Sequence, residues 1–269
     1  MEINEWKRML IPYEQAVEEL KIKFKGIRNE YRKLDEYSPI EFVTGRVKKI
    51  SSILEKAKKK QIPLTEIEEK IEDIAGIRIM CQFVKDINKV VELIRNRDGK
   101  DLKIVEERDY IKNIKPSGYR SYHIIVLYPV QTAGGQKEIL TEIQIRTLAM
   151  NFWATIEHSL RYKYNKNMPE YIQQRLIKAA EAAFILDQEM AEIREEVLKA
   201  EEQFQVKSHI VSDIFCNIQN LYNVSGIDEA GELYQKFWEL WEEGDVKKLE
   251  DFNKKIDTLA EIYGAQKLM

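Results

Sequence analysis

The sequence predicts an α+β fold with a mixed, mainly antiparallel sheet of about five strands, flanked by helices and followed by a helical C-terminal extension. Segments 119–128 and 136–147 alternate in character and are joined by QTAGGQ, whose glycines permit the tight turn of an antiparallel hairpin. Residues 74–110 add a strand–helix–strand pattern. The rest of the chain has the periodicity of helices.

The segments before the first clear strand are predicted to be helical. Residues 2–34 carry large apolar side chains every three or four positions, and Pro12 is a point where this helix can kink. Pro39 cannot continue the helix, so it marks a break. A second helix is expected over 45–60, and a short acidic helix over 64–70 leads into the sheet.

The sheet and the segments that follow it give the remaining elements. Strands are predicted over 74–83, 102–110, 119–128 and 136–147, with a helix over 86–97. Further helices are expected over 148–164, over 169–207, and as two or three helices between 208 and 264. We therefore divide the chain into a domain over 1–207 and a C-terminal extension over 208–269.

Composition favours a soluble protein. Of the 269 residues, 44% are hydrophobic and 33% are charged, which is ordinary for a globular chain. The first ten residues, MEINEWKRML, are charged where a signal peptide needs an apolar run, and the longest apolar stretch, 124–128, cannot span a bilayer. We expect a cytoplasmic protein with no membrane partner.

Charge is distributed unevenly along the chain. From Ser208 onward there are six Lys or Arg residues and 12 Asp or Glu residues. Residues 1–207 contain 37 Lys or Arg and 34 Asp or Glu. The basic groups cluster in residues 45–60, where seven are Lys or Arg. Two interpretations remain open, a solvated charged face or a stripe that binds polyphosphate, because like charges three or four positions apart repel unless an anion is present. A helical wheel places Lys48, Lys49, Ser52, Lys56, Lys59 and Lys60 opposite Val47, Ile50, Leu54 and Ala57.

Two carboxylates are candidates for chemistry. Glu142 lies on the polar side of the strand over 139–147, which is either a water-exposed face or the floor of a site. Asp73 precedes the strand over 74–83. Carboxylates brought together at a sheet surface repel unless a cation joins them, and hard oxygen ligands near phosphate suit Mg²⁺. The sequence therefore indicates Mg²⁺ as the cofactor.

The segment KPSGYRSYH supplies a lysine in a loop followed by aromatic side chains. Lys115 stands in the loop, and Tyr119 and His123 fall on one face of the strand that emerges from it. Each aromatic residue taken alone is equally well explained as a core side chain. Together with a cationic helix and two carboxylates, they make the set that phosphoryl transfer between nucleotides requires, where catalysis is mostly positioning and charge neutralisation.

Four segments in order carry a family resemblance: SPIEFVTGRVK, DIAGIRIMCQFV, SGYRSYH and EIQIRTLAMNFWATIEHSL. Over residues 3–204 the chain resembles the small alarmone synthetases, the single-domain members of the RelA/SpoT family, and especially the RelQ-like group. The resemblance implies a nucleotidyltransferase-like synthetase fold. It also implies transfer of the β,γ-pyrophosphate of ATP to the 3′-hydroxyl of GTP or GDP, which makes pppGpp or ppGpp.

The resemblance also implies roles for individual residues. On the donor side, Arg46 and Arg78 sandwich the adenine, and planar guanidinium groups suit stacking better than an ammonium group does. Asp73 and Glu142 match the Mg²⁺ ligands, and Glu142 also matches the general base for the 3′-hydroxyl. The positions that match ATP-phosphate ligands are Lys48, Ser52, Lys56 and Lys59.

On the acceptor side, Tyr119 matches the residue that stacks on guanine. Lys115, His123, Gln144 and Arg146 match acceptor-side or orienting polar positions. Position 117 is Ser where long RelA/SpoT relatives often carry Asn, which leaves the choice among acceptor nucleotides open.

Regulation and partners follow from the same resemblance. RelQ-like enzymes form homotetramers with a cleft that binds pppGpp as an activator, and single-stranded RNA opposes that activation. The alternative function is therefore an RNA-binding regulator, although two carboxylates would repel RNA phosphates. None of His123, His158 or His209 is followed by Asp, so we expect synthesis without hydrolysis. The positions matching the regulatory cleft are Lys21, Lys25, Arg28, Glu41, Phe42, Thr44 and Asn151.

Overall fold

The computed structural model describes residues 3–163, 168–225 and 227–263. The chain divides into two compact units, Met1–Ala191 and Glu192–Met269. The predicted helix ends at Tyr164 and Gly264 lie outside the described residues. None of the helices in the described ranges combines the length and the apolar character that crossing a membrane requires.

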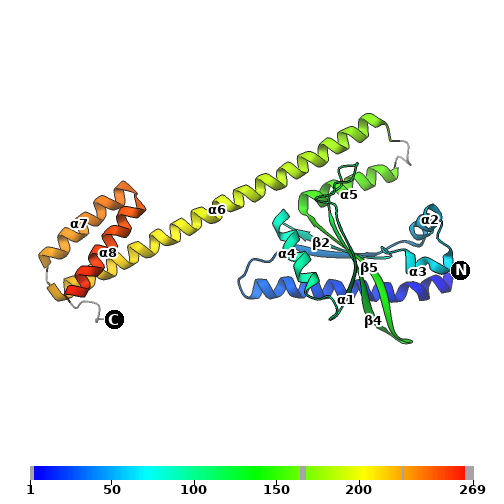
Figure 1. The fold of residues 1–269 in the computed structure, drawn as a ribbon, viewed down its shortest axis with the longest axis horizontal. Coiled ribbons are helices and arrows are strands. Elements are labelled where there is room, and N and C mark those ends of the chain that lie inside the picture. Colours follow the sequence, from blue (N-terminus) through cyan, green and yellow to red (C-terminus); the bar gives the residue numbers. More distant parts are fainter. Residues whose placement is uncertain (1–2, 164–167, 226, 264–269) are drawn as a thin grey trace. The chain divides into compact units, whose positions relative to one another are not determined.

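The N-terminal unit is built on a five-stranded mixed sheet in the order β1-β2-β5-β4-β3 (Figure 1). The β2–β5 pair is parallel and the other three pairs are antiparallel, so the prediction of a mixed, mainly antiparallel sheet is confirmed. Strands β4 and β5 form the predicted hairpin, closed between Thr132 and Gly135. The strands are β1 (Phe42–Val47), β2 (Ala75–Cys81), β3 (Lys103–Asp109), β4 (Tyr122–Thr132) and β5 (Gly135–Thr147).

One face of the sheet is apolar and carries two helices, α1 (Ile3–Lys33) and α4 (Val84–Arg95). The side chains on this face join the inward sides of both helices in a single buried cluster. The approach of α1 to β1 depends on Gly45, because a Cβ at this position would lie 2.6 Å from Cγ1 of Val17. The strand side chains at the centre of the cluster, all without solvent exposure, are Ile77, Ile79, Ile124, Val126, Ile143 and Ile145.

The other helices of this unit lie at the ends of the strands. α2 (Ile50–Lys60) precedes a short turn, η1 (Leu64–Glu66), and α3 (Ile67–Lys70). α5 (Leu148–Lys163) follows β5 directly, because Thr147 accepts a hydrogen bond from the backbone N–H of Met150 and so caps the helix. The start of α6 (Glu170–Ser225) packs on α5 through a small cluster that includes Trp153 and Ala180.

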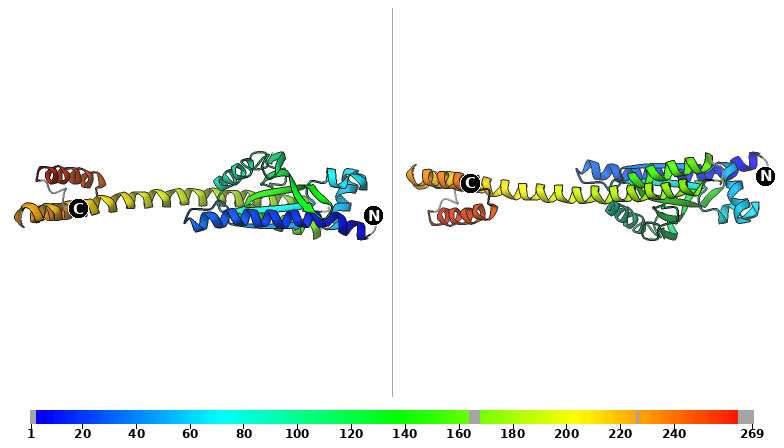
Figure 2. Two further views of the ribbon diagram at one scale, coloured as in Figure 1. Left: turned by 90° about the horizontal axis from the view of Figure 1, so that it is seen from below. Right: turned by 90° about the horizontal axis from the view of Figure 1, so that it is seen from above.

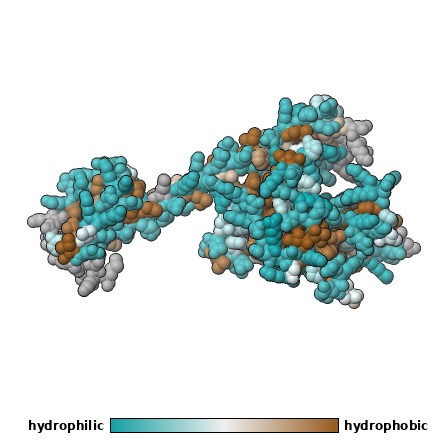
Figure 3. Space-filling view, viewed as in Figure 1, coloured by the Kyte–Doolittle hydropathy of each residue, from teal (hydrophilic) through white to brown (hydrophobic). Residues whose placement is uncertain are grey.

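The C-terminal unit is helical and has a core of its own. The later part of α6 packs with α7 (Ile227–Glu243) and α8 (Val246–Ile262), and the last two lie side by side in both views of Figure 2. Asp245 caps α8 by accepting from two backbone N–H groups. Hydrophilic side chains cover most of the surface visible in Figure 3. The predicted helical extension is therefore present, and α6 runs through position 207 without a break.

Two local predictions are wrong. Residues 42–47 form an edge strand, whereas we expected a helix to begin at position 45, so α2 starts only at Ile50. The buried side of α2 consequently consists of Ile53 and Ala57, and Leu54, which we expected on that side, is 40% exposed. Because residues 45–47 pair with β2 as part of β1, they do not belong to the helix, and a helical wheel that begins at position 45 misplaces Leu54.

Candidate active site

The second face of the sheet is polar, and strand register explains which side chains share it. Thr44, Arg78, Gln144, His123 and Arg108 are paired across β1, β2, β5, β4 and β3 in that order. Paired residues on adjacent strands point to the same side of a sheet. The row therefore brings together groups from five separate segments. Two residues away on their own strands, Arg46, Glu142 and Arg146 join the same face.

Glu142 is the best-connected acid on this face. Its Oε1 lies 3.0 Å from Nδ1 of His123, and its Oε2 accepts from Nε2 of Gln144 at 2.6 Å. Its side chain is 13% exposed, and this burial disfavours the charged form. The hydrogen bonds from His123 and Gln144 outweigh burial and lower the pKa of the carboxyl. Glu142 is therefore ionised at neutral pH.

His123 connects Glu142 to Tyr119. The Tyr119 hydroxyl lies 2.8 Å from Nε2 of His123 and accepts from Nη2 of Arg146 at 2.5 Å. Because Arg146 can only donate, the hydroxyl hydrogen is available to His123, whose proton then resides on Nδ1 and points at the carboxylate. Burial lowers the pKa of His123, in agreement with a neutral ring. The chain of bonds fixes the orientation of Glu142.

Asp73 lies two residues before β2 and is held by two lysines. Nζ of Lys48 donates to one carboxylate oxygen at 2.7 Å, and Nζ of Lys56 donates to the other at 2.8 Å. Burial disfavours ionisation of Asp73, but the two ammonium groups outweigh it and lower the pKa of the carboxyl. The negative charge of Asp73 in turn acts to raise the pKa of Glu142. The two carboxylates thus share one electrostatic environment.

The remaining donor-side residues are distributed over β1, β2 and α2. Burial lowers the pKa of Arg78, and the neighbouring guanidinium groups of Arg146 and Arg46 lower it further. Arg46 and Lys59 are exposed, and Ser52 is half-buried. The strand register places Arg46 and Arg78 on the same face of the sheet, because Arg46 pairs with Gly76, two residues before Arg78.

The loop before β4 places Lys115 against two tyrosines. Its Nζ lies 4.0 Å from the ring centre of Tyr110 and 4.9 Å from that of Tyr119. Burial lowers the pKa of Lys115, with further lowering by Arg108, Arg146 and Lys56. The basic side chains predicted to bind the donor nucleotide and those predicted to bind the acceptor nucleotide therefore lie in one region. A site of this kind favours a polyanion.

The positions that resemble a regulatory cleft lie on the edge of the sheet and the helices beside it. Lys21, Lys25 and Arg28 share α1, and Arg28 donates to the backbone carbonyl of Glu41 at 3.3 Å. Phe42 and Thr44 are exposed on β1. Asn151 lies on α5, and its buried Oδ1 has no hydrogen-bond partner among the described residues.

Sequence reasoning missed two residues of the polar face. Arg108 on β3 pairs with His123 in the register and donates to both carboxylate oxygens of Glu72 at 2.9 Å. Tyr110 packs its ring edge-on against His123, with ring centres 5.1 Å apart. The sequence alone shows that residues 106, 108 and 110 share one side of a strand. It does not show the strand order that brings β3 beside β4.

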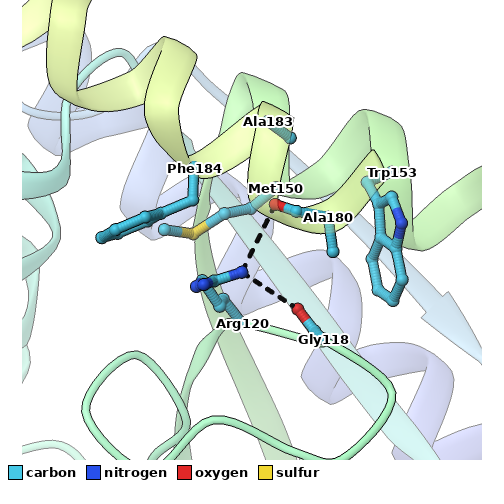
Figure 4. A pocket seen from close by; sticks show the side chains of 7 residues that line it. All are labelled: Gly118, Arg120, Met150, Trp153, Ala180, Ala183 and Phe184. Carbon is cyan, nitrogen blue, oxygen red and sulfur yellow. Dashed lines mark hydrogen bonds between the residues drawn. The ribbon is translucent and has the colours of Figure 1, made fainter. Parts of the chain in front are cut away.

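A small pocket beside the site is structural. Figure 4 shows Arg120 between Gly118, Met150, Phe184 and Ala180, with Nη1 donating to the carbonyls of Gly118 and Ala180. Its volume of about 10 Å³ leaves no room for a nucleotide. Arg120 here ties the loop before β4 to α6.

The fold and the polar face together define an enzyme of phosphoryl transfer, with acidic and basic groups fixed on a sheet whose other face forms the core. Residues 45–167 match the family model described as the region found in RelA / SpoT proteins. The chain is 61% identical over 207 residues to GTP pyrophosphokinase YjbM of Bacillus subtilis, spanning 77% of this chain and 97% of the relative. It is 42% identical over 197 residues to GTP pyrophosphokinase YwaC of the same organism, spanning 72% and 93%.

Solved structures give the same result. The small alarmone synthetase 1 of B. subtilis bound to its product pppGpp is 63% identical, with a TM-score of 0.69 over 72% of this chain and 98% of that one. The same enzyme bound to AMPCPP has a TM-score of 0.64 at 58% identity, over 72% and 98%. The chain belongs to the RelA/SpoT family and is a small alarmone synthetase, a GTP pyrophosphokinase, as its motifs indicated.

Proposed function

We propose that this enzyme transfers the β,γ-pyrophosphate of ATP to the 3′-hydroxyl of GTP or GDP and releases AMP. The observation that carries the proposal is the position of Asp73, which Lys48 and Lys56 hold three residues before Gly76, the residue of β2 that pairs with Glu142 on β5. The B. subtilis relative binds pppGpp as its product and also binds AMPCPP, a compound that resembles ATP. These ligands support both the donor and the product of the proposed reaction.

On the donor side, the lysines of α2 and the segment before it bind the ATP phosphates. Lys48 and Lys56 form ion pairs with Asp73, so their ammonium groups point toward the place where the phosphates are needed. Ser52 and Lys59 lie on the same helix, about one turn before and one turn after Lys56. The guanidinium groups of Arg46 and Arg78 hold the adenine by stacking.

Asp73 and Glu142 are suited to hold Mg²⁺. Both offer only carboxylate oxygens, and the described residues contain no group of three or more His, Cys, Asp or Glu side chains that would favour a protein-enclosed metal. A metal bound by two carboxylates and substrate phosphates is the usual arrangement for Mg²⁺. When bound, Mg²⁺ would neutralise charge that develops on the transferred group. Lys48 and Lys56 are then free to move from Asp73 to phosphate.

On the acceptor side, Glu142 accepts the hydrogen of the 3′-hydroxyl as this oxygen attacks the β-phosphorus of ATP. The carboxylate is ionised because of its lowered pKa, and His123 and Gln144 hold it in position. Tyr119 stacks on the guanine, while Lys115 and Arg146 bind acceptor phosphates. The leaving group is AMP, and the reaction consumes no water.

The test of this function is incubation with ATP, GTP and Mg²⁺, with AMP and pppGpp separated by anion exchange. We expect both products in equal amounts, and none when EDTA removes the metal. Incubation with pppGpp alone should give no pyrophosphate, because synthesis without hydrolysis is proposed. An enzyme that forms neither AMP nor pppGpp would refute the reaction. The RNA-binding alternative is disfavoured by two carboxylates on the binding face.

We further propose homotetramers in which pppGpp activates the enzyme through Lys21, Lys25, Arg28, Glu41, Phe42, Thr44 and Asn151. The buried, unpaired Oδ1 of Asn151 and the exposed Lys25 support a ligand or subunit contact here. Lys25→Ala with Arg28→Ala should abolish stimulation by pppGpp, about 5- to 150-fold for a typical coupling. Lys33→Ala, an exposed charge on the same helix, should retain it. Full stimulation of the double variant would contradict the assignment.

A further inference from the structure

The C-terminal unit, Glu192–Met269, lies outside the part of the chain that the proposed reaction uses. The resemblance to other synthetases ends near residue 204, and 77% of this chain already matches 97% of the B. subtilis relative YjbM. No residue assigned above to the donor, the acceptor or the regulatory cleft belongs to this unit. Its helices nevertheless pack around a core of their own, so the unit presents a defined surface.

Three aromatic side chains form a line along one side of α7. Tyr234, Trp238 and Trp241 are spaced by four and three positions, so they are neighbours on the helix surface. Trp238 is 54% exposed and Trp241 is 38% exposed, whereas Phe237 beside them is buried. The ring centre of Phe237 lies 5.3 Å from that of Trp238 and 6.1 Å from that of Trp241. The buried ring therefore supports both indoles at the surface.

Helix α6 borders this line of aromatic side chains. The ring centres of Phe215 and Tyr234 are 5.8 Å apart, and Nζ of Lys207 lies 4.1 Å from the ring centre of Trp241. The two helices are therefore antiparallel here. Phe204 precedes Lys207 by three positions and is 69% exposed, so it extends the same surface along α6. We name this surface the aromatic seam, which consists of Phe204, Lys207, Tyr234, Trp238 and Trp241.

The aromatic seam exposes a large apolar area for so small a unit. With about 150–250 Å² for each large aromatic side chain, the exposed fractions of Phe204, Trp238 and Trp241 leave roughly 300 Å² in contact with water. Contiguous apolar patches of a few hundred Å² on soluble proteins are often interaction sites. Tryptophan is also enriched among the residues that supply most of the binding energy at interfaces. The area and the residue types therefore favour a contact with another protein.

Acidic side chains border the aromatic seam and restrict the kind of partner. Glu242 lies one turn after Trp238, and Glu201 lies one turn before Phe204. Within the described ranges, neither of these glutamates forms an ion pair. Residues 208–269 contain six Lys or Arg and 12 Asp or Glu, so a second copy of this surface, a nucleic acid or an anionic membrane would be repelled. The position of Lys207 over Trp241 shows that a cation fits against the indole rings.

We propose that the aromatic seam is a docking surface for a basic amphipathic helix of another protein. A helix that binds in this way presents apolar anchors at spacings of three and four positions, which is also the spacing of the seam. Its Lys and Arg residues would pair with Glu201 and Glu242 and lie over the indole rings as Lys207 does. The C-terminal unit thus attaches the synthetase to a basic partner protein without occupying any residue of the candidate active site.

The first test measures binding of a synthetic peptide to the full-length enzyme by fluorescence anisotropy. The labelled peptide is a helix of about two heptads with Leu at the apolar positions and Lys at the others. We expect it to bind, and its affinity should fall as salt increases, because salt screens the acidic border. A peptide of the same pattern with Glu in place of Lys should not bind. Equal binding of the two peptides, or no binding of the Lys peptide at up to about 1 mM, would overturn the proposal.

Two variants locate the binding site. Trp238→Ala removes an exposed ring, leaves Phe237 in the core, and should weaken binding of the Lys peptide by at least about tenfold. Glu242→Lys changes an exposed charge, so the fold is retained, and it should weaken binding several-fold and reduce the salt dependence. The matched controls in the N-terminal unit are Tyr171→Ala, which removes an exposed aromatic side chain, and Glu189→Lys, which makes the same charge change. Wild-type affinity in both seam variants would overturn the proposal.

Two further measurements detect a different occupant. Sedimentation velocity should give the same oligomer for wild type and Trp238→Ala, and a smaller species for the variant would make the seam an interface between copies of this chain. Any binding of oligouridylate should be equal in the two proteins, and its loss in the variant would assign the seam to single-stranded RNA. Either result overturns the proposal. AMP release should be unchanged in Trp238→Ala, so failure of the proposed reaction and failure of the docking surface are measured separately.

Discussion

The two faces of the five-stranded sheet use the same strands for opposite purposes. Ile77, Ile143 and Ile145 have no solvent exposure and pack under α1 and α4. Their immediate neighbours, Arg78, Glu142 and Gln144, lie on the other face and are bonded to one another. Stability and chemistry are therefore divided residue by residue along β2 and β5.

The polar face maintains its charges through mutual contacts instead of exposure to water. Asp73 and Glu142 have lowered pKa values although burial opposes their ionisation, because Lys48, Lys56 and His123 are fixed beside them. Glu142, which His123 and Gln144 hold in position, needs little reorganisation when a charged substrate binds. The difference between the faces teaches that adjacent substitutions should separate activity from folding.

The largest effect is expected on the polar face, from Glu142→Gln. Loss of the proposed metal ligand and proton acceptor should lower kcat/KM by about 10³-fold or more, the equivalent of about 4 kcal/mol in the transition state. The unfolding free energy should change by less than about 1 kcal/mol, because glutamine is isosteric. AMP release and urea unfolding followed by circular dichroism measure the two quantities. An active Glu142→Gln would remove the proposed base.

A smaller effect is expected from Ile143→Ala on the apolar face, which should lower stability and leave activity nearly unchanged. Ile143→Ala creates a cavity under the helices and should destabilise the N-terminal unit by about 2–5 kcal/mol. At 15 °C, where the protein stays folded, kcat/KM should remain within a few-fold of the wild type. The same two assays apply. If activity fell as far as in Glu142→Gln while the protein remained folded, the division between the faces would be incorrect.

The smallest effect concerns Asp187, at the point where β5 ends. Its buried carboxylate accepts from Oγ1 of Thr147 at 2.6 Å, and burial raises its pKa to about 6. An acid whose pKa is raised by folding costs no stability below its unfolded value, and the cost grows to its full size above pH 6. Asp187→Asn should stabilise the protein by about 1–2 kcal/mol at pH 8, after allowance for solvent screening.

The pH dependence distinguishes this cause from a general packing effect. Thermal unfolding of Asp187→Asn and wild type should differ at pH 8 and converge near pH 4, where the wild-type carboxyl is protonated. A constant difference between the two proteins across this range would mean that ionisation of Asp187 is not responsible.

The strands with strong local signals were predictable from the sequence. The β4–β5 hairpin and β2 follow from alternation and glycine placement, which are local properties. The strand β1 was not recognised because its six residues, FVTGRV, include Gly45 and run into a lysine-rich helical pattern. Only its pairing with β2 and the close contact with Val17 make it a strand, and both are tertiary.

The candidate site was predictable where charge clusters or motif resemblance marked it. Lys56 and Asp73 were both expected, yet their hydrogen bond was not, because it joins two segments whose distance depends on the fold. Arg108 was missed for the same reason. It lies in a segment that reads as an ordinary strand, and only the strand order places it beside β4 and His123.

The parallel register of β2 and β5 has a consequence for folding. Residues paired here are 66 positions apart, as in Gly76 with Glu142, whereas β4 and β5 meet through a tight turn. Strand pairs that are distant in sequence form late, because the conformational entropy of a large loop must be lost when they form. A chain emerging from the ribosome thus has Asp73 and its lysines exposed well before Glu142 is synthesised. Enzymatic competence consequently arises in one late step, when the centre of the sheet closes.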